Sequence, residues 1–410
     1  MPPPSTSSEE EQSKHYHILR NLALIATLSA ALSVHIFSGF YARDARLTSK
    51  LSGPEYVAEL RNGHPEIFKS AIGMQKHVFD KLLDVLERRG GLRSSKYMCT
   101  DEKLAIFLSM ATTGMTNREA QNRFQRSADT ISKTVHKIID ILVSPVIYNA
   151  YVRLSRDTDD TPPEIKDNKK LYPYLRDCLG ALDCTHIHAH VLAEDRPRYR
   201  NRKGFISQNV LAVVSFDMQF MYVLSGWEGS AADSTILDDA RKCDFLIPRS
   251  KFYLGDAGFS ASTSVLVPYR GVRYHLREWH AGNQNPRPQN AKELFNLRHA
   301  QARNVVERIF GVFKRRFSII NAAPEYLIET QAALIQALCV VHNIIRIYDP
   351  HDVPRLDDLL DETESEELRE RAAGGGQTEK NQAEVMRDQI AEDMWKNYVF
   401  ERQRRANKNK

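Results

Sequence analysis

Two aspartates follow short apolar runs in the sequence, and both could bind a metal ion. Asp183 comes directly after residues 179–182, and Asp256 comes after residues 252–255. A short apolar run of this kind predicts a buried strand, so each carboxylate is expected where a strand emerges from a sheet. Two carboxylates at neighbouring strand ends repel each other unless a cation lies between them. The pattern therefore predicts a cation site.

Glu307 is the candidate for the third ligand. It falls in an expected helix whose apolar stripe includes Val306, and it lies about 100° from Val306, at the border of the buried face. Three oxygen donors without cysteine suit Mg²⁺ or Mn²⁺ rather than zinc. Two such ions about 3.5 to 4 Å apart can drive phosphodiester cleavage. Asp183, Asp256 and Glu307 are therefore the predicted catalytic and metal-binding residues, and the alternative for each is a surface acid or helix cap.

Positive charge is dense near these three acids in the sequence. A loop interleaved with aromatic residues follows Asp183, and further cations lie in the helix of Glu307. So many cations beside an acidic cluster predict a site for a phosphate backbone, although a solvated charged face has the same composition. The predicted DNA contacts here are Arg200, Arg202, Lys203, Arg303, Lys314 and Arg315.

Two more residues are candidates for an auxiliary role in the site. Asp233 is expected to open a helix, where the helix dipole favours an acid. His186 alternates with His188 and His190 in an expected strand, which places all three rings on one side. Because such rings stand about 6.6 to 7 Å apart, hydrogen-bonded histidines are favoured over a metal clip.

Upstream of the acids, the pattern predicts three short helices with tight turns. Thr116 and Glu119 have the spacing of a capping box, and Ser127 can cap the third helix. This layout is typical of a helix-turn-helix DNA reader, whose third helix would present Lys133 and Lys137 to DNA. A plain three-helix bundle explains the same pattern equally well.

From residue 178 onward the pattern changes to strands. The expected order is strand, hairpin, helix, strand, strand and long helix, which is typical of an RNase H-like α/β core with a mixed sheet. The hairpin is expected at 210–216 and 220–227, the later strands at 252–254 and 265–269, and the helices at 230–241, 304–317 and 330–348.

Five segments are predicted from these patterns and from length, since 410 residues exceed one ordinary domain. They are a disordered N-terminus plus an apolar helix (1–63), a helical, helix-turn-helix-like DNA-binding domain (64–155), a linker (156–170), an RNase H-like catalytic domain (171–350) and a charged, flexible tail (351–410). The basic end of the tail is interpreted as a nuclear address or a phosphate-binding arm.

Composition limits the class of protein further. The formal net charge is +5, which permits a polyanionic partner without requiring one. The five cysteines are odd in number and include no C-x-x-C pair. This argues for a reducing compartment and against a structural zinc site.

An apolar run at residues 21–42 contains no Lys, Arg, Asp or Glu and is long enough to cross a bilayer. It carries several serines, however, and its leucines and isoleucines recur at helical spacing. A helix docked on the protein is therefore favoured over membrane insertion. A polar, acidic stretch precedes the run, which is unlike a cleavable signal peptide.

Six motifs occur in an order that resembles the PIF/Harbinger DDE transposases and their host-derived nuclease relatives. They are LDCTHI at 182–187, YRNRKG at 199–204, WEGS at 227–230 with Asp233, LGDAGF at 254–259, VERIFG at 306–311 and VHNI at 341–344. The resemblance covers about 171–348 and extends upstream through 117–139. One departure is Cys184, where the family often has glycine.

The resemblance implies an RNase H-like fold, with Asp183, Asp256 and Glu307 as catalytic metal ligands. It also implies nuclear residence and, often, a separate Myb-like DNA-binding protein as partner. We therefore expect a DNA endonuclease that uses two metal ions, with homo-oligomer formation left open. The alternative is a domesticated, transposase-derived DNA-binding or scaffold protein that no longer cuts.

Overall fold

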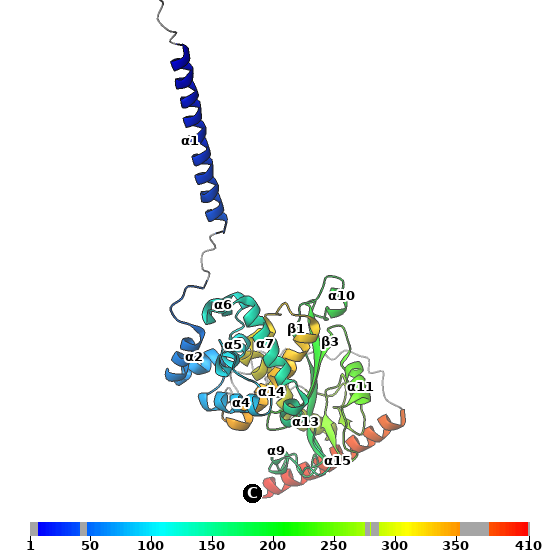
Figure 1. The fold of residues 1–410 in the computed structure, drawn as a ribbon. Coiled ribbons are helices and arrows are strands. Elements are labelled where there is room, and N and C mark those ends of the chain that lie inside the picture. The colour runs from blue at the N-terminus through cyan, green and yellow to red at the C-terminus, as the bar shows by residue number, and fades with distance from the viewer. Residues whose placement is uncertain (1–6, 42–46, 275–278, 280–286, 353–376, 409–410) are drawn as a thin grey trace, which may run out of the picture. The chain divides into compact units, whose positions relative to one another are not determined.

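One mixed sheet organises the computed structural model, which describes residues 7–41, 47–274, 279, 287–352 and 377–408 (Figure 1). Its strands are β1 (Cys178–His188), β2 (Ser207–Val214), β3 (Phe220–Glu228), β4 (Phe252–Leu254) and β5 (Val265–Leu266). The order in the sheet is β3-β2-β1-β4-β5. The pairs β1–β2 and β2–β3 are antiparallel, whereas β1–β4 and β4–β5 are parallel. The predicted α/β class with a mixed sheet is thereby confirmed.

Helices cover both faces of this sheet because successive strand residues point to opposite faces. Ala181 belongs to the large core that includes α13 (Ala291–Arg316) and α14 (Ile328–Tyr348). Its neighbour Leu182 belongs to a smaller core on the other face, which includes α11 (Asp233–Cys243). A strand buried on both faces has a continuous apolar sequence, which is why this run could be recognised.

The predicted elements of this region are confirmed with shifted ends. Strand β4 has the expected bounds, while β2 begins three residues earlier than predicted and β5 ends earlier, at Leu266. The largest difference is in α13, which begins at Ala291 instead of residue 304. The Asn290 side chain caps this start by accepting the N–H of Glu293 at 2.9 Å.

The upstream helices are α2 (Gly53–Asn62), α3 (Pro65–Ile72), α4 (Lys76–Arg88), α5 (Thr100–Thr113), α6 (Asn117–Phe124), α7 (Ala128–Leu142), α8 (Pro145–Tyr151) and α9 (Pro163–Lys166). The three expected helices are α5, α6 and α7, and the capping box of Thr116 with Glu119 is present. Ser127 caps α7 by accepting from the N–H of Thr130. Helices α4, α7 and α8 pack against α14, and α5 packs against the 3₁₀ turn η1 (Ser318–Asn321), so these helices belong to the same compact unit as the sheet.

Two segments that were predicted to be flexible, the linker (156–170) and the tail (351–410), contain residues that pack on the rest of the protein. Within the expected linker, Ile165 of α9 is fully buried. In the expected flexible tail, α15 (Gln377–Lys408) packs on α13 and buries Ala391 and Met394. The Tyr269 hydroxyl also donates to Asp388 at 2.6 Å. Residues 353–376 of that tail lie outside the described residues.

The apolar segment near the N-terminus forms α1 (Ser7–Tyr41), which belongs to a separate unit, residues 1–50. The expectation of disorder to about residue 15 is wrong for residues 7–15, which are helical. By length and composition, residues 11–38 and helix α14 could each cross a membrane, but two thirds of the tested window of α14 is buried in the protein. The choice between docking and membrane insertion for α1 stays a prediction.

Three buried amides on α13 and α14 each hold a distant piece of backbone by two hydrogen bonds. Asn343 accepts the N–H of Phe220 at 2.8 Å and donates to its carbonyl at 2.7 Å. Asn296 makes the same pair of bonds to Tyr269, and Gln331 makes it to His190. Because an unpaired buried backbone group is costly, these amides fix where the ends of the sheet lie against the helices.

Replacing Asn343 should destabilise the protein. In Asn343→Leu, the N–H and carbonyl of Phe220 and the carbonyl of Tyr151, which the amide also binds at 2.8 Å, lose their partner inside the core. We expect the free energy of unfolding to fall by about 2 to 4 kcal/mol, measured by urea denaturation. Gln336→Leu, which removes a half-buried amide from the same helix, should change it by less than about 0.5 kcal/mol. Equal effects would contradict the role given to Asn343.

Candidate active site

Asp183 lies where β1 loses one of its two neighbours. On the β4 side, pairing ends at Ala181 with Leu254, whereas on the β2 side Asp183 pairs with Ala212. The expectation that Asp183 ends its strand is therefore wrong, because β1 continues along β2 to His188. The carboxylate nevertheless stands beyond the last residue of β1 that pairs with β4, so β1 has no parallel neighbour at Asp183.

Backbone groups orient both aspartates. Asp256 lies two residues after β4, and its Oδ1 accepts the N–H of Gly258 at 2.9 Å. A Cβ atom added at Gly258 would approach that oxygen to 3.1 Å, so glycine keeps the carboxylate accessible at this turn. Oδ1 of Asp183 likewise accepts the N–H of Cys184 at 2.9 Å. Each carboxylate is thus positioned by the chain that immediately follows it.

Glu307 reaches the same region from α13. Its neighbours Val306 and Ile309 are fully buried and fix the helix on the sheet, while Glu307 stays half-exposed at the border of that face, as predicted. One turn earlier, Arg303 donates from Nη1 to Oδ2 of Asp183 at 2.7 Å and from Nη2 to Oε1 of Glu307. A single guanidinium therefore joins the first and third predicted acids.

Arg303 was predicted as a DNA contact, and the structure places it differently. Its side chain is 9% exposed and is bonded on both sides to carboxylates. Burial by itself would lower the pKa of Arg303, but Tyr274 and the surrounding carboxylates outweigh burial and hold that pKa well above its ordinary value. Asp256 is among those carboxylates, so all three predicted acids act on one buried charge.

Asp233 approaches the site from the opposite face of the sheet. It is the first residue of α11, as predicted, and its Oδ1 accepts from the Asn209 amide at 2.9 Å. Burial raises the pKa of Asp233, and the charge of Asp256 raises it further. Burial, followed by the charge of Asp233, also raises the pKa of Cys184 well above its usual value. Cys184 is therefore a buried thiol and not a reactive one.

Several predicted DNA contacts gather around His186. Burial, together with the charges of Lys314, Lys203 and Arg202, lowers the pKa of His186 to about 4, so the ring is neutral at pH 7. Its Nδ1 lies 3.2 Å from the Ser207 hydroxyl. Cations from the loop after β1 and from α13 therefore act on one residue of the strand that carries Asp183.

The other predicted DNA contacts are distributed over separate surfaces. Arg200 is exposed in the loop after β1 and donates to the carbonyl of Gly204 at 2.8 Å, and Arg315 is half-buried on α13. Lys133 and Lys137 lie on the exposed side of α7, where Lys133 pairs with Asp129. These residues are accessible to a polyanion, and their contact with DNA stays a prediction.

Three residues that organise the site, Tyr274, His299 and Gln331, were not predicted from the sequence. Tyr274 accepts from Nε of Arg303 at 2.8 Å, and its hydroxyl lies 3.3 Å from Nδ1 of the buried His299. Gln331 holds the backbone of His190, where the cationic loop begins. Polar residues at buried positions of an apolar helix were the available signal for His299 and Gln331, since such groups need partners. For Tyr274 the sequence offered no comparable signal.

The donor set has the chemistry of a site for a hard cation, because its members are carboxylate oxygens. Arg303 already acts as a positive charge between two of them. Among the described residues, no three His, Cys, Asp or Glu side chains stand close enough together to hold one metal ion in the present arrangement. The ligand types therefore fit Mg²⁺ or Mn²⁺, while the guanidinium lies where two of the ligands would meet the ion.

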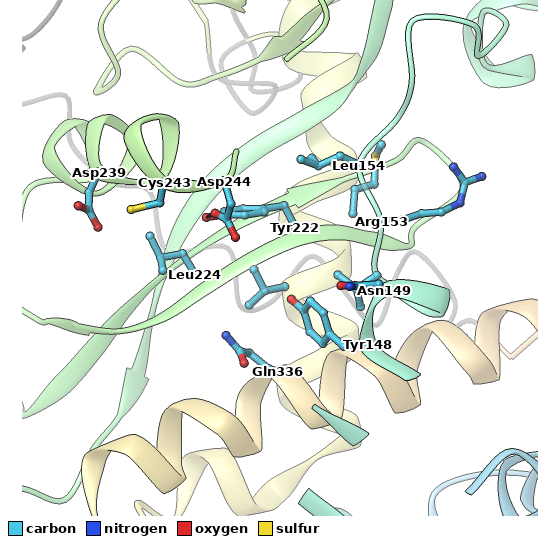
Figure 2. Close-up of a pocket in the computed structure, with 13 residues that line it drawn as sticks. Tyr148, Asn149, Arg153, Leu154, Tyr222, Leu224, Asp239, Cys243, Asp244 and Gln336 are labelled. Atoms are coloured by element: carbon cyan, nitrogen blue, oxygen red, sulfur yellow. Dashed lines mark hydrogen bonds between the residues drawn. The ribbon is translucent and has the colours of Figure 1, made fainter. Parts of the chain in front are cut away.

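A cavity of about 470 Å³ lies elsewhere, against strand β3 and helices α8, α11 and α14. Figure 2 shows Tyr148, Tyr222 and Asp244 among its lining residues, and the Tyr222 hydroxyl donates to Asp244 at 2.6 Å. The lining includes no predicted site residue. The predicted acids therefore lie outside this cavity.

Comparison with known families divides the chain in two. Residues 48–144 match a family described as a domain of unknown function (DUF8040), which covers α2 to α7. Residues 182–343 match the family described as DDE superfamily endonuclease, which spans the sheet, α13 and most of α14. Asp183, Asp256 and Glu307 all fall inside the second match.

Several relatives are similar to most of the chain at low identity. "Protein ALP1-like" of Arabidopsis thaliana is 23% identical over 80% of this chain and 82% of its own length. "Putative nuclease HARBI1" of Rattus norvegicus is 24% identical over 61% of this chain and 68% of its own length, and the Homo sapiens protein of that name is 23% identical. No solved structure matches the chain. The chain is therefore homologous to the ALP1-like and HARBI1 proteins, and its residues 182–343 match the DDE superfamily endonuclease family.

Proposed function

We propose that this chain is a divalent-metal-dependent DNA endonuclease, transposase-like in its chemistry, with an RNase H-like catalytic core. One observation carries the proposal: Asp183, Asp256 and Glu307 all act on the same buried guanidinium, at the place where β1 passes the end of β4. Two carboxylates bonded to one guanidinium, with the charge of a third acting on it, indicate a site that needs positive charge. The matched endonuclease family supports the same reaction class.

Asp183, Asp256 and Glu307 are the proposed catalytic metal ligands. Asp183 and Asp256 would hold one ion, and Asp183 with Glu307 would hold a second. When bound, Mg²⁺ or Mn²⁺ would activate the attacking hydroxyl and stabilise the leaving oxygen in phosphodiester cleavage. Asp233, which acts electrostatically with Asp256, and His186, which is neutral at pH 7, are proposed as auxiliary residues.

DNA is the proposed substrate because cations gather near His186, on the strand that also carries Asp183. The charges of Arg202, Lys203 and Lys314 act on His186, beside the strand of Asp183, and would bind phosphates next to the scissile bond. Arg200 and Arg315 would extend that contact. Helix α7, with exposed Lys133 and Lys137, is proposed as the recognition helix of a helix-turn-helix.

A second candidate is a transposase-derived DNA-binding or scaffold protein that does not cut. The ion pairs of Arg303 favour it, because they already provide two of the acids with a positive charge. Both candidates share DNA as partner and differ in catalysis alone.

Nuclear residence, a separate Myb-like DNA-binding partner and self-association are proposed alongside either candidate. The exposed basic end of α15, which includes Arg404 and Arg405, is compatible with nuclear import. For α1 we retain docking on protein as the proposal, in preference to membrane insertion.

Removing a metal ligand should abolish DNA cutting. We expect the full chain to nick supercoiled plasmid in Mg²⁺. Asp183→Asn should lower the nicking rate by more than roughly 100-fold, because removing a residue that only supports a metal ligand already costs roughly 10- to 100-fold. Asp140→Asn on the exposed face of α7 is the matched control and should keep wild-type activity. Equal nicking by wild type and Asp183→Asn would refute the enzyme, and tight DNA binding without nicking would establish the second candidate.

Removing a loop cation should weaken DNA binding at every sequence. For Lys203→Gln we expect a lower affinity for duplex DNA and a slope of log K against log salt smaller by about 0.9, as for one lost phosphate contact. Fluorescence anisotropy across a salt series measures both quantities. Lys169→Gln, an exposed lysine of the predicted linker, should leave the slope unchanged. A slope that does not respond to Lys203→Gln would place the DNA elsewhere.

A further inference from the structure

The guanidinium of Arg303 uses all three of its edges inside the protein. Nη1 binds Asp183, Nη2 binds Glu307, and Nε donates to the Tyr274 hydroxyl at 2.8 Å. The planar fork of arginine matches two carboxylates in this way, which a lysine ammonium cannot do with the same geometry. Arg303 is therefore held as a fixed group and not as a loose counter-ion.

A series of hydrogen bonds runs from Arg303 through Tyr274 and His299 to Leu266 of β5. The carbonyl at its end can only accept, which decides which atom donates in each bond. Nε2 of His299 lies 2.9 Å from the carbonyl oxygen of Leu266, so Nε2 carries the proton and Nδ1 is an acceptor. The Tyr274 hydroxyl then donates to Nδ1 of His299, and its oxygen accepts from Nε of Arg303. Burial lowers the pKa of His299 to about 3, which keeps this ring neutral. This series of hydrogen bonds holds Arg303 from the side away from the acids.

The position of Arg303 bears directly on the ions of the proposed function. The two-ion arrangement gives Asp183 and Glu307 to the second ion, and the guanidinium joins these two carboxylates. Asp256 acts on Arg303 through its charge, and its Oδ1 accepts the backbone N–H of Gly258. The three carboxylates carry three negative charges, and one guanidinium balances one of them. The two negative charges that remain equal in size the charge of one divalent ion.

We propose that Arg303 is a built-in cation in the place of the second metal ion, so that the DNA-free chain takes up one divalent ion and excludes another. This inference rests on the proposed function, because it assumes that the three acids hold metal. A second ion would enter only after Arg303 releases Asp183 and Glu307. A DNA phosphate is a partner that the guanidinium could take instead, since its fork matches phosphate as well as carboxylate. Arg303 thus acts as a positioning residue that would link metal loading to DNA binding.

Counting bound ions tests the proposal without measuring cleavage. The DNA-free full chain is titrated with Mn²⁺, and free Mn²⁺ is followed by electron paramagnetic resonance. We expect one tightly bound ion per wild-type chain and two per chain of Arg303→Gln. Arg308→Gln, which removes a half-buried cation from the same helix, should keep the count at one. Arg303→Lys retains the charge and should also stay at one.

The thermal midpoint gives a second readout. Without metal, Arg303→Gln should unfold at a lower temperature than wild type, and Mn²⁺ should raise its midpoint more than that of wild type, because ions bound to the folded state stabilise it. Should this variant fold only with Mn²⁺, the same conclusion follows. Should it never fold, the wild-type count decides: one ion supports the proposal and two overturn it.

The failures of the two proposals are distinguishable. Two ions on wild type, or an unchanged count in a folded Arg303→Gln, would overturn the role of Arg303 while leaving the endonuclease intact, and plasmid nicking would show that. If neither wild type nor Arg303→Gln binds Mn²⁺, the acids hold no metal, and the proposed function fails together with this inference.

Discussion

Repulsion among carboxylates is the constraint on which this site depends. The end of β4 and the middle of β1 bring Asp256 and Asp183 into one region, and α13 adds Glu307. Such a cluster is stable in a folded chain only with positive charge beside it. Arg303 provides that charge from a helix whose own position is set by the burial of Val306 and Ile309. Helix α13 therefore does two things at once: its apolar stripe packs on the sheet, and its Arg303 balances the charge of the carboxylates.

Buried amides connect the same helices to the rest of the site. Gln331 fixes the chain at His190, from which the cationic loop departs, and Asn296 fixes the chain at Tyr269, just before Tyr274. Each amide replaces the hydrogen bonds that a neighbouring strand would give. The chain can then leave the sheet at His190 and at Tyr269 without leaving these backbone groups unpaired inside the protein.

Sequence periodicity predicted the elements but not their partners. Strand β4 and helix α14 were found because apolar runs and helical stripes depend on neighbours in sequence. The early start of α13 was missed because its first turns are polar, and the packing of α15 was missed because Ala391 and Met394 are few among many charges. The pairing of Arg303 with Asp183 joins residues 120 positions apart. Spacing along a helix predicts a shared face, but it cannot say which distant side chain meets that face.

Burial, more than residue type, separates the cations of this region by role. Arg202 and Lys203 are exposed, so their charges can exchange solution counter-ions for DNA phosphates at little cost. Arg303 has already exchanged water for two carboxylates and a phenol, and it can approach DNA only by giving up those bonds. A buried charge removed from its partners loses far more than an exposed one. An arginine near these acids in the sequence can therefore be either a phosphate contact or an internal counter-charge. For Arg303, the packing of α13 on the sheet decides between the two, because it buries the side chain.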